Sequence, residues 1–537
     1  MTGAEAILKS LENEGVEYIF GYPGATIAPF YDRLAGSRIR HVLVRHEQHA
    51  GHAASGYARV SGRPGVCAAT SGPGATNLIT ALGTAYMDSV PMVAITGQVD
   101  SGLLGRDVFQ EADITGAAAP FTKYGYLVKN ASDIPRVIKE AFHIAGSGRP
   151  GPVLIDIPVD AQQRKGDFVF PESVSIRGYK PTVSGHMGQI KRVARALGQA
   201  ERPVICAGGG IFASGAGGVL RSFAEGLNIP VVSTMMGIGA LPTAHPLYMG
   251  MVGMHGRNVA NMAVERSDVL LLAGARVSDR AVLLPANVSK ATKIIHIDID
   301  PAEIGKNLTT FIPVVADIGT ALAQILECGP ARRGGGWPAE LAGMRAKPSP
   351  GRAAGGLVDP RAFVGLLTRA LPDDYIYAAD VGQNQLWSAG SCDIRDGGRF
   401  LTTGGMGTMG YSIGAAIGAK LAAPERACVA VCGDGAFQMS MMELGTICQH
   451  GIDVKLVVMA NGRLGLVREI QTRQFRDNQF AVDLSGSPDP VKIASAYGIP
   501  GRTVSGMDEA AEAIGELVAS KGPRLLACAV DPSEMSG

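Results

Sequence analysis

The sequence predicts an α/β protein built from three doubly wound parallel-sheet domains. Apolar runs of strand length alternate with stretches of helical spacing along most of the 537 residues, which is the pattern of parallel sheets with crossover helices. Glycine is frequent (72 residues) without a fixed period, as expected where many strands turn tightly into helices. A chain of this length accommodates two to four domains.

The expected strands fall into three blocks. Residues 1–165 and residues 185–330 each alternate strands with helices. Residues 331–358 are rich in Gly, Pro and basic residues and are predicted to be a linker, and residues 359–537 form the third block. The strands expected in the three blocks are 42–45, 66–69, 92–96 and 153–157; 204–207, 231–234, 269–273 and 294–297; and 375–379, 427–431, 455–459 and 525–530.

The composition argues against several classes of partner. The chain has 49 basic and 48 acidic residues, so it favours neither nucleic acid nor an anionic membrane. No apolar stretch reaches the roughly 18 residues of a spanning helix, and the chain opens into a helical pattern rather than a signal segment. The eight cysteines are scattered, mostly within apolar runs such as those of Cys67 and Cys206. We therefore expect reduced thiols and a cytoplasmic protein.

One spacing near the end of the chain carries chemical information. Gly433-Asp434-Gly435 follows an apolar strand, and Asn461 follows the next apolar strand, 27 residues after Asp434. A right-handed crossover would place these two side chains together at the carboxyl edge of a parallel sheet, where such folds bind ligands. Two hard oxygens beside glycine-rich backbone suit Mg²⁺ held jointly by the protein and a diphosphate. A Gly-Asp-Gly turn alone is equally often an ordinary turn, so the paired Asn461 decides the interpretation.

The motifs along the chain resemble those of one enzyme family. The resemblance is to the large, catalytic subunit of thiamine-diphosphate-dependent acetolactate synthase (acetohydroxyacid synthase), and it covers nearly the whole length. It implies the thiamine-diphosphate-binding fold. The matching segments are GYPGA (21–25), RHEQ (45–48), SGPGATN (71–77), DSVPMVAITGQV (88–99), FQE (109–111), GRPGPVLIDIP (148–158), GMHG (253–256), GAR (274–276), HIDIDPAEIGKN (296–307), DVGQNQLW (380–387) and GGMGTMGYSIGAAIGA (404–419).

The resemblance assigns catalytic roles to three residues. An isolated glutamate at a helix start is more often a surface carboxylate. Glu47, however, matches the acid that in this family forms a hydrogen bond with N1′ of the cofactor's aminopyrimidine. That hydrogen bond lets the cofactor act as its own base. Gln110 and Lys123 match residues near the substrate end. For Lys123, a solvated surface position is an equally good interpretation. The implied reaction is decarboxylation of pyruvate and ligation of the hydroxyethyl unit to a second 2-keto acid, giving 2-acetolactate or 2-aceto-2-hydroxybutyrate, the first step of branched-chain amino-acid biosynthesis.

The resemblance also implies the contacts of thiamine diphosphate and its metal. Met409 would support the bent cofactor, and the Gly407 carbonyl would accept from its 4′-amino group. Asn384 stands where the family usually has His but can still donate to phosphate. The backbone carbonyl of Arg463 would join Asp434 and Asn461 as a Mg²⁺ ligand. The cofactor-binding residues are then Pro73, Asn77, Gly382, Gln383, Asn384, Gly407, Met409, Gly433, Asp434, Gly435, Ala436 and Asn461.

The second block matches the family's FAD-binding domain. Its glycine triplet after a strand is by itself a weak nucleotide-loop signal, but residues 296–307 match closely, and the flavin's role in this family is largely structural. The residues that match positions around FAD are Arg149, Gly208, Gly209, Gly210, Met254, His255, Gly256, Gly274, Arg276, Arg280, Asp298, Ile299 and Asp317.

The resemblance further implies how the chain assembles. The first and third blocks each supply half of a thiamine site, and in this fold the halves come from different subunits, so a homodimer or homotetramer is expected. It leaves open a small regulatory subunit. Val159 and Ile470 stand where many members have Lys and Trp, which predicts a weaker preference for 2-ketobutyrate as second substrate.

Three alternatives remain at this point. Another thiamine-dependent 2-keto-acid decarboxylase, oxidase or carboligase on the same scaffold is the nearest. A synthase-like protein that lost catalysis and acts as a binding partner is disfavoured by Glu47, Asp434 and Asn461. A nucleotide-binding dehydrogenase is disfavoured because no GxGxxG with an acidic ribose partner occurs in the right context.

Overall fold

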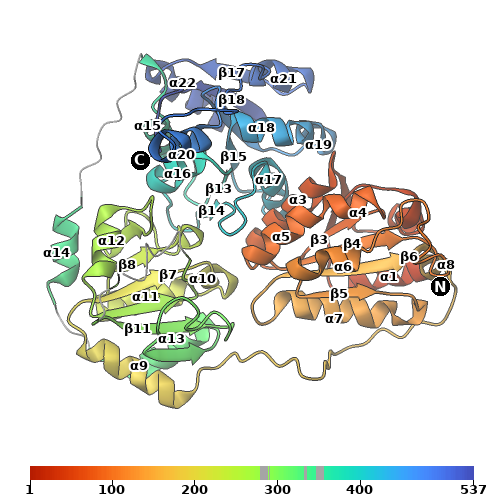
Figure 1. Cartoon of the computed structure of the whole chain (residues 1–537), viewed down its shortest axis with the longest axis horizontal. Helices are drawn as coiled ribbons and strands as arrows, with labels where there is room; N and C mark the ends of the chain where they lie inside the picture. Colours follow the sequence, from red (N-terminus) through yellow and green to blue (C-terminus); the bar gives the residue numbers. More distant parts are fainter. Residues whose placement is uncertain (279–287, 289–290, 332–334, 346–355, 537) are drawn as a thin grey trace.

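The computed structural model describes residues 1–278, 288, 291–331, 335–345 and 356–536. It contains three six-stranded sheets, and every strand pair recorded within these residues is parallel. In each sheet the chain winds out in both directions from the first strand, which places crossover helices on both faces. Figure 1 shows the three domains side by side. The predicted α/β class with three doubly wound sheets is confirmed.

The N-terminal sheet has the order β2-β1-β3-β4-β6-β5. Its strands are β1 (Tyr18–Gly21), β2 (Arg40–Leu43), β3 (Gly65–Ala69), β4 (Met92–Gln98), β5 (Tyr124–Leu127) and β6 (Pro152–Pro158). Its helices are α1 (Gly3–Asn13), η1 (Ala25–Ile27), α2 (Ala28–Leu34), α3 (Glu47–Ser61), α4 (Pro73–Asn77), α5 (Ile79–Met87), α6 (Ile114–Ala118), η2 (Ala119–Phe121), η3 (Ala131–Asp133), α7 (Ile134–Gly146) and α8 (Val159–Gln163).

The middle sheet has the order β12-β11-β10-β7-β8-β9, which is the strand order of dinucleotide-binding folds. Its strands are β7 (Pro203–Ala207), β8 (Val231–Ser233), β9 (Tyr248–Met251), β10 (Val269–Ala273), β11 (Lys293–Asp298) and β12 (Ile312–Val315). Its helices are α9 (Met187–Gln199), α10 (Gly210–Ala213), α11 (Gly217–Leu227), η4 (Met235–Gly237), α12 (Asn258–Glu265) and α13 (Ile318–Glu327). The segment predicted as a linker contains α14 (Trp337–Gly343), whose Trp337 and Leu341 are buried in the core of this domain.

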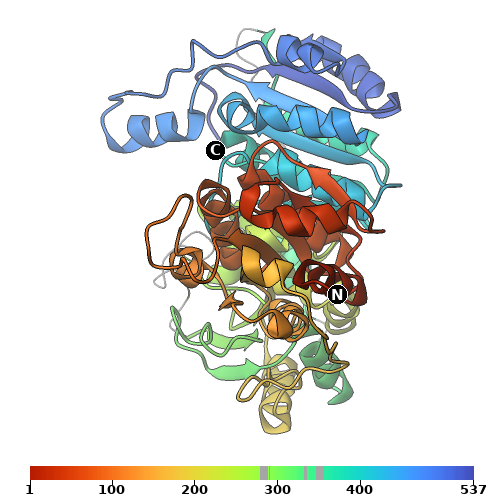
Figure 2. The same cartoon turned by 90° about the vertical axis from the view of Figure 1, so that its right-hand side faces the viewer.

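The C-terminal sheet repeats the order of the first, β14-β13-β15-β16-β18-β17. Its strands are β13 (Ile376–Ala379), β14 (Arg399–Leu401), β15 (Cys428–Gly433), β16 (Lys455–Ala460), β17 (Gly501–Val504) and β18 (Arg524–Ala529). Its helices are α15 (Pro360–Ala370), α16 (Gln383–Ser391), α17 (Tyr411–Ala422), α18 (Asp434–Ser440), η7 (Met441–Glu443), α19 (Leu444–His450), α20 (Gly465–Gln474), α21 (Pro490–Ala496) and α22 (Met507–Ala519). In Figure 2 the blue segment that carries α20 extends away from this domain.

The first and third domains meet along α3 and α17. A Cβ added at Gly56 of α3 would lie 1.9 Å from the Ala415 carbonyl oxygen, and one added at Gly418 of α17 would lie 1.8 Å from the Ala53 carbonyl oxygen. The two helix backbones therefore touch, which only glycine at these positions allows. Buried residues of both domains form one continuous apolar core around this seam.

All eight cysteines are free thiols, and most are buried, as expected for structural thiols. Within the described ranges, no helix combines the length and the apolar composition that a membrane crossing requires.

Candidate active site

The Gly-Asp-Gly turn and Asn461 meet at one edge of the C-terminal sheet. Gly433, the last residue of β15, pairs with Met459 on β16, so Asp434 and Asn461 both follow directly at the carboxyl ends of neighbouring strands. Asp434 Oδ1 accepts a hydrogen bond from the Gly435 N–H at 2.9 Å, and Oδ2 accepts one from the Gly462 N–H at 2.6 Å. The structure thus brings the two residues of the motif together.

The electrostatics of this edge suit a cation. Burial raises the pKa of Asp434, and among the residues that the structure describes no cationic side chain forms an ion pair with it. Nor do those residues include any cluster of three or more His, Cys, Asp and Glu that could hold a metal alone. The edge therefore offers one carboxylate and one amide oxygen, which leaves coordination positions for cofactor oxygens and water. Mg²⁺ is commonly held in this way.

Arg463 directs its side chain away from this edge. Its guanidinium donates to Gln479 at 3.2 Å and lies 3.7 Å from the Asp483 carboxylate. Its backbone N–H donates to Asn461 Oδ1 at 3.1 Å. Only backbone atoms of Arg463 are therefore near Asn461, which is compatible with the carbonyl ligand that the family resemblance implies.

Two glycines with left-handed backbone line the same side of the sheet. Gly382 precedes α16 with φ 126°, Gly407 has φ 66°, and a Cβ at either position would meet no atom within 4 Å. Both positions therefore require glycine and face open space. Met409 reaches towards the start of α18, because its Cε lies 3.5 Å from where a Cβ at Gly435 would be. Ala436, the next residue of α18, is buried.

The neighbouring pair Gln383 and Asn384 point in different directions. Gln383 Oε1 accepts from Asn461 Nδ2 at 2.9 Å, which places Gln383 at the edge that carries Asp434 and Asn461. Asn384 is buried, and its Nδ2 donates to the carbonyls of Asp380 and Val431 at 3.2 and 2.8 Å. In this conformation neither amide hydrogen of Asn384 is left for a phosphate oxygen.

Glu47 is the first residue of α3 and lies at the edge of the N-terminal sheet. Its Oε2 accepts from Asn77 Nδ2 at 2.9 Å, and its Oε1 lies 3.2 Å from where a Cβ at Gly74 would be. Pro73 begins the same short helix that Asn77 ends. The carboxyl group is thus held by one side-chain amide and is neither buried nor ion-paired to a described residue.

Gln110 lies beside the same loop. It has a left-handed backbone with φ 60°, which is uncommon for a residue other than glycine. A Cβ at Gly72 would lie 3.0 Å from both the Cβ and the carbonyl oxygen of Gln110, so the two loops are in contact. The structure therefore gathers Glu47, Asn77 and Gln110 at one edge.

Lys123 lies in a different environment. Its ammonium donates to the carbonyls of Ile144 and Ser147 and, at 2.9 Å, to the Tyr179 hydroxyl. Burial lowers the pKa of this ammonium to about 8. These partners lie at the C-terminal end of α7 and in the connection to the middle domain, so Lys123 stabilises this part of the fold and is not gathered with Glu47.

Three buried carboxylates that the sequence analysis did not single out support the two edges. Asp380 accepts from the backbone N–H groups of Gly410 and Ser412 at 2.9 and 2.8 Å. Asp88 accepts from the N–H groups at the start of the same glycine-rich loop and pairs with Arg59 at 3.0 Å. Asp380 and Asp88 both lie in motifs that match the family, and these motifs are the sequence feature from which the two residues could have been selected.

Glu443 is the third of these carboxylates, and it links the two domains. It accepts from the backbone N–H groups of Arg45 and His46 at 2.9 and 3.1 Å, immediately before Glu47. Burial raises its pKa to about 7. No sequence pattern pointed to Glu443, because its partners are backbone groups almost 400 residues away.

The glycine loops of the middle domain meet at the point where its strand order reverses. Gly210 donates its N–H to the Gly274 carbonyl at 3.0 Å. A Cβ at Gly208 would lie 2.2 Å from the same oxygen, and Gly209 packs against Met236. These loops follow β7 and β10, between which a dinucleotide would bind in such a sheet.

Three charged residues of the predicted FAD site line the borders between domains. Arg149 of the first domain forms ion pairs with Asp300 and Glu303 of the middle domain at 3.2 and 2.9 Å. The Arg276 guanidinium lies 3.1 Å from where a Cβ at Gly405 would be. Burial raises the pKa of Asp298 to about 6.

The other predicted FAD contacts are less informative. Asp317 caps α13 by accepting from the Thr320 N–H at 2.9 Å and also accepts from Ser214 at 3.0 Å, so its carboxylate already has a structural role. Ile299 follows β11 beside Asp298, and Arg280 lies outside the described residues. Met254, His255 and Gly256 form the turn before α12, in which Met254 is exposed.

Three family models match the chain in consecutive segments. They are the thiamine pyrophosphate enzyme N-terminal binding domain at residues 1–117, the central domain at residues 190–325 and the C-terminal binding domain at residues 380–528. Each segment lies within one of the three sheet domains, and together they cover most of the sequence.

Curated relatives match over nearly the whole chain. The acetolactate synthase large subunit of Corynebacterium glutamicum is 45% identical over 526 residues, which are 96% of this chain and 84% of that protein. A probable acetolactate synthase large subunit of Methanocaldococcus jannaschii is 44% identical, with 99% of this chain and 93% of that protein covered. The acetolactate synthase of Mycobacterium bovis is 45% identical, with 93% and 83% covered. The chain therefore belongs to the acetolactate synthase large-subunit family of thiamine pyrophosphate enzymes.

Proposed function

We propose that the chain condenses two 2-keto acid molecules into 2-acetolactate, with release of carbon dioxide from pyruvate. The observation that carries this proposal is the placement of two residue pairs. Glu47 and Asn77 lie at the carboxyl edge of the N-terminal sheet, and Asp434 and Asn461 lie at the carboxyl edge of the C-terminal sheet. Thiamine diphosphate, when bound, supplies a nucleophilic carbon and stabilises the charge left by decarboxylation.

The residues of the N-terminal edge would act on the organic end of this cofactor. Glu47 would exchange a proton with N1′ of the aminopyrimidine, and Asn77 would orient the Glu47 carboxyl group for that contact. Gln110, on the adjoining loop, would orient a substrate carboxylate or carbonyl. Lys123 is a weaker candidate for that task, because its ammonium is already held by carbonyl groups.

The residues of the C-terminal edge would bind the diphosphate end. Asp434, Asn461 and the Arg463 carbonyl would hold Mg²⁺, and the glycines that flank Asp434 would face the diphosphate. Gln383 would lie beside this site and hold Asn461 by the hydrogen bond that it accepts from the Asn461 amide. Met409 would support the thiazolium ring from its position beside α18. The buried carboxylate of Asp434, which lacks a described cationic partner, is the feature that favours a bound cation.

The middle domain would bind FAD in a structural role. Its strand order and the two glycine loops at the reversal point support a dinucleotide site. Arg149 and Arg276 would be cationic partners for the phosphates. Flavin absorbance in the purified protein, or a rise in unfolding temperature on addition of FAD alone, would test this assignment.

The active site would be completed by a second copy of the chain. Within one chain, hydrogen bonds such as those of Glu443 join the two domains, but among the described residues none joins Glu47 or its partner Asn77 to Asp434 or Asn461. Large apolar side chains are exposed beside each edge, with Phe109 86% exposed next to Gln110 and Phe480 78% exposed in the segment after α20. Burial of such residues against a partner would favour a homodimer or homotetramer.

The relatives are named as large subunits, which supports a second, small regulatory subunit as a partner of this chain.

The preference for one 2-keto acid as second substrate would follow from Ile470. It lies on α20 and is 42% exposed, and it lacks the aromatic surface of the Trp that many family members have at this position. Pyruvate would therefore be the main second substrate.

A single incubation tests the proposal. The purified chain is mixed with pyruvate, Mg²⁺ and thiamine diphosphate, with and without FAD, and the products are identified by NMR. 2-Acetolactate is the expected product. Acetaldehyde or acetyl phosphate would instead indicate a decarboxylase or oxidase on the same scaffold.

A further inference from the structure

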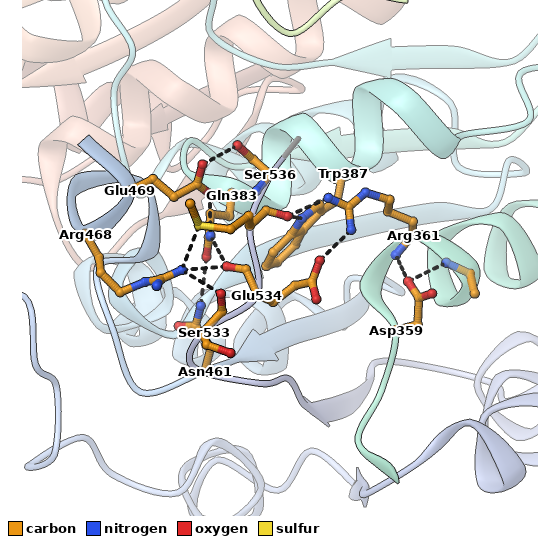
Figure 3. A network of polar contacts seen from close by, with 12 residues as sticks. Asp359, Arg361, Gln383, Trp387, Asn461, Arg468, Glu469, Ser533, Glu534 and Ser536 are labelled. Atoms are coloured by element: carbon orange, nitrogen blue, oxygen red, sulfur yellow. Dashed lines mark hydrogen bonds and ion pairs between the residues drawn. The ribbon is translucent and has the colours of Figure 1, made fainter. Parts of the chain in front are cut away.

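A buried polar cluster joins α20 to a segment that follows β18, beside the proposed metal site (Figure 3). Arg468 and Glu469 of α20 are 6% and 2% exposed. Arg468 donates to the carbonyls of Ser533 and Glu534 at 3.1 and 2.7 Å. Glu469 accepts from the backbone N–H and the hydroxyl of Ser536 at 2.6 and 2.9 Å. Helix α20 thereby holds this segment against the C-terminal sheet.

The same cluster uses both hydrogens of the Gln383 amide. Gln383 Nε2 donates to Glu469 Oε1 at 2.5 Å and to the Glu534 carbonyl at 2.7 Å. An amide nitrogen carries two hydrogens, and here one is donated to Glu469 and the other to the Glu534 carbonyl. The orientation of the Gln383 amide is therefore fixed, with its oxygen directed away from Glu469 (Figure 3).

That oxygen in turn determines the orientation of the Asn461 amide. Gln383 Oε1 accepts from Asn461 Nδ2 at 2.9 Å, so the side-chain nitrogen of Asn461 faces Gln383 and its oxygen faces the other way. If the Gln383 amide were reversed, two amide nitrogens would face each other and the hydrogen bond would be lost. Asn461 could then turn its nitrogen, which cannot bind a cation, towards Asp434.

Gly465 provides the space that this arrangement needs. It is the first residue of α20, and a Cβ there would lie 1.8 Å from Gln383 Oε1 and 3.0 Å from Asn461 Nδ2. Its φ does not lie in the left-handed region, so an alanine would fit the helix backbone, and its nearest neighbours would be the two amides.

We infer that Glu469 is a positioning residue of the metal site. With the Glu534 carbonyl it fixes the Gln383 amide, and through that amide it keeps the oxygen of Asn461 directed to a cation shared with Asp434. Partners that orient metal ligands in this way influence affinity without touching the metal. The inference rests on the proposed function only in assuming that a divalent cation binds between Asp434 and Asn461.

The test measures metal binding directly. Mg²⁺ is titrated by calorimetry into metal-free protein that contains saturating thiamine diphosphate, and Mn²⁺ binding is followed by electron paramagnetic resonance as a second probe. We expect Glu469→Ala to weaken both by roughly 10–100-fold. Glu469→Gln should stay within about 3-fold of the original chain, because its amide oxygen can still accept from Gln383 and its nitrogen can donate to the Ser536 hydroxyl.

Gly465→Ala provides an independent variant, because alanine favours a helix and the fold should be retained. It should weaken Mg²⁺ binding as Glu469→Ala does. Glu512→Ala, an exposed carboxylate of α22, is the matched control and should change nothing. Unaltered Mg²⁺ binding in Glu469→Ala and Gly465→Ala, or equal losses in Glu469→Gln and Glu469→Ala, would overturn the inference. If the original chain itself binds neither Mg²⁺ nor Mn²⁺ with thiamine diphosphate, the proposed function fails instead.

Discussion

The N-terminal and C-terminal sheets share one strand order, 2-1-3-4-6-5 when each is counted from its own first strand, whereas the middle sheet has the order 6-5-4-1-2-3. In both of the matching domains the second strand leads into a long helix, α3 or α17, and these two helices pack with their backbones in contact. The difference lies in what precedes and begins the helix. Helix α3 starts with the carboxyl group of Glu47, while α17 follows the glycine-rich loop that carries Met409.

The comparison shows how one scaffold can bind the two ends of one cofactor. The N-terminal edge offers a carboxyl group oriented by Asn77, which suits proton exchange with a heterocycle. The C-terminal edge offers the oxygens of Asp434 and Asn461 beside glycine backbone, which suits a metal diphosphate. The division of labour therefore comes from a few side chains at the carboxyl edges of the two sheets, with Glu47 after the second strand and Asp434 after the third, and not from a different fold.

The largest effect is expected at the N-terminal edge. Glu47→Gln removes the acid but keeps the shape and the contact with Asn77, so 2-acetolactate formation should fall by roughly 10²–10⁴-fold. Thiamine diphosphate should still bind, as measured by calorimetry. Proton exchange at the thiazolium C2, followed by NMR, should slow in parallel; exchange at the original rate would remove Glu47 from its assigned role.

Asp434→Asn probes the opposite edge and should give the converse pattern. Loss of the charged ligand should weaken binding of Mg²⁺ with thiamine diphosphate by roughly 100-fold, while activity returns in part at high concentrations of both. Calorimetric titration gives the affinity. An unchanged Mg²⁺ requirement would contradict the assignment of Asp434 as a ligand.

The same variant has a stability effect of the opposite sign. Because burial raises the pKa of Asp434, the folded metal-free chain holds this proton more tightly than the unfolded chain. The ionised carboxylate therefore destabilises the metal-free fold at neutral pH, and this penalty disappears as the pH falls through the raised pKa. Asp434→Asn should accordingly raise the unfolding temperature of the metal-free protein at pH 7 but not at acidic pH.

The contact between α3 and α17, which joins the N-terminal and C-terminal domains, can be disrupted by a larger side chain. Gly418→Val places side-chain atoms where the Ala53 carbonyl lies 1.8 Å from the Cβ position, and overpacking of this kind should cost about 3 kcal/mol of unfolding free energy. Denaturant unfolding measures the loss. Gly390→Ala is the matched control, because a Cβ there meets no atom within 4 Å; similar stabilities of the two variants would show that the seam tolerates separation.

Most of the architecture followed from sequence periodicity, but short and locally polar features did not. All twelve expected strands are present within a few residues, because buried parallel strands are continuous apolar runs. The strands that were not anticipated have three or four residues, and all but β1 lie at sheet edges; they are β1, β5, β9, β12, β14 and β17. Helix α14 was hidden in a Gly- and Pro-rich stretch because only two of its residues, Trp337 and Leu341, are buried.

Site residues could be predicted from the sequence where the residue type itself provides the chemistry. They could not be predicted where the role of a residue depends on partners that only the tertiary structure brings close. Glu47, Asp434 and Asn461 could be selected from their motifs. The supporting carboxylates Glu443 and Glu469 could not, since their hydrogen-bond partners come from segments up to about 400 residues away. For the same reason the carbonyl partners of Lys123 were not apparent.

A smaller effect is expected at the acceptor pocket. Ile470→Trp adds aromatic surface on α20, and the ratio of 2-aceto-2-hydroxybutyrate to 2-acetolactate formed in competition should rise by roughly 10-fold. Product NMR with equal concentrations of pyruvate and 2-ketobutyrate measures the ratio. Ile470→Leu serves as the control, and an unchanged ratio in Ile470→Trp would place acceptor selection elsewhere.

The smallest catalytic effect is expected for Lys123, which lies in the same domain as Glu47, directly before β5, but is not gathered with Glu47. Lys123→Met removes the hydrogen bonds to Ile144, Ser147 and Tyr179, so the unfolding temperature should fall while kcat changes by less than about 3-fold. Loss of activity with unchanged stability would return Lys123 to a role on the substrate.

The most direct test of two half-sites from two chains is subunit complementation. At concentrations of Mg²⁺ and thiamine diphosphate too low to rescue Asp434→Asn, the Glu47→Gln and Asp434→Asn chains should each have little activity alone. In a mixed dimer, one of the two sites combines an intact Glu47 with an intact Asp434. Random pairing makes half of the dimers mixed, so the mixture should recover about a quarter of the original 2-acetolactate activity. If the mixture is no more active than the average of the two separate variants, each site is built within one chain and the account is wrong.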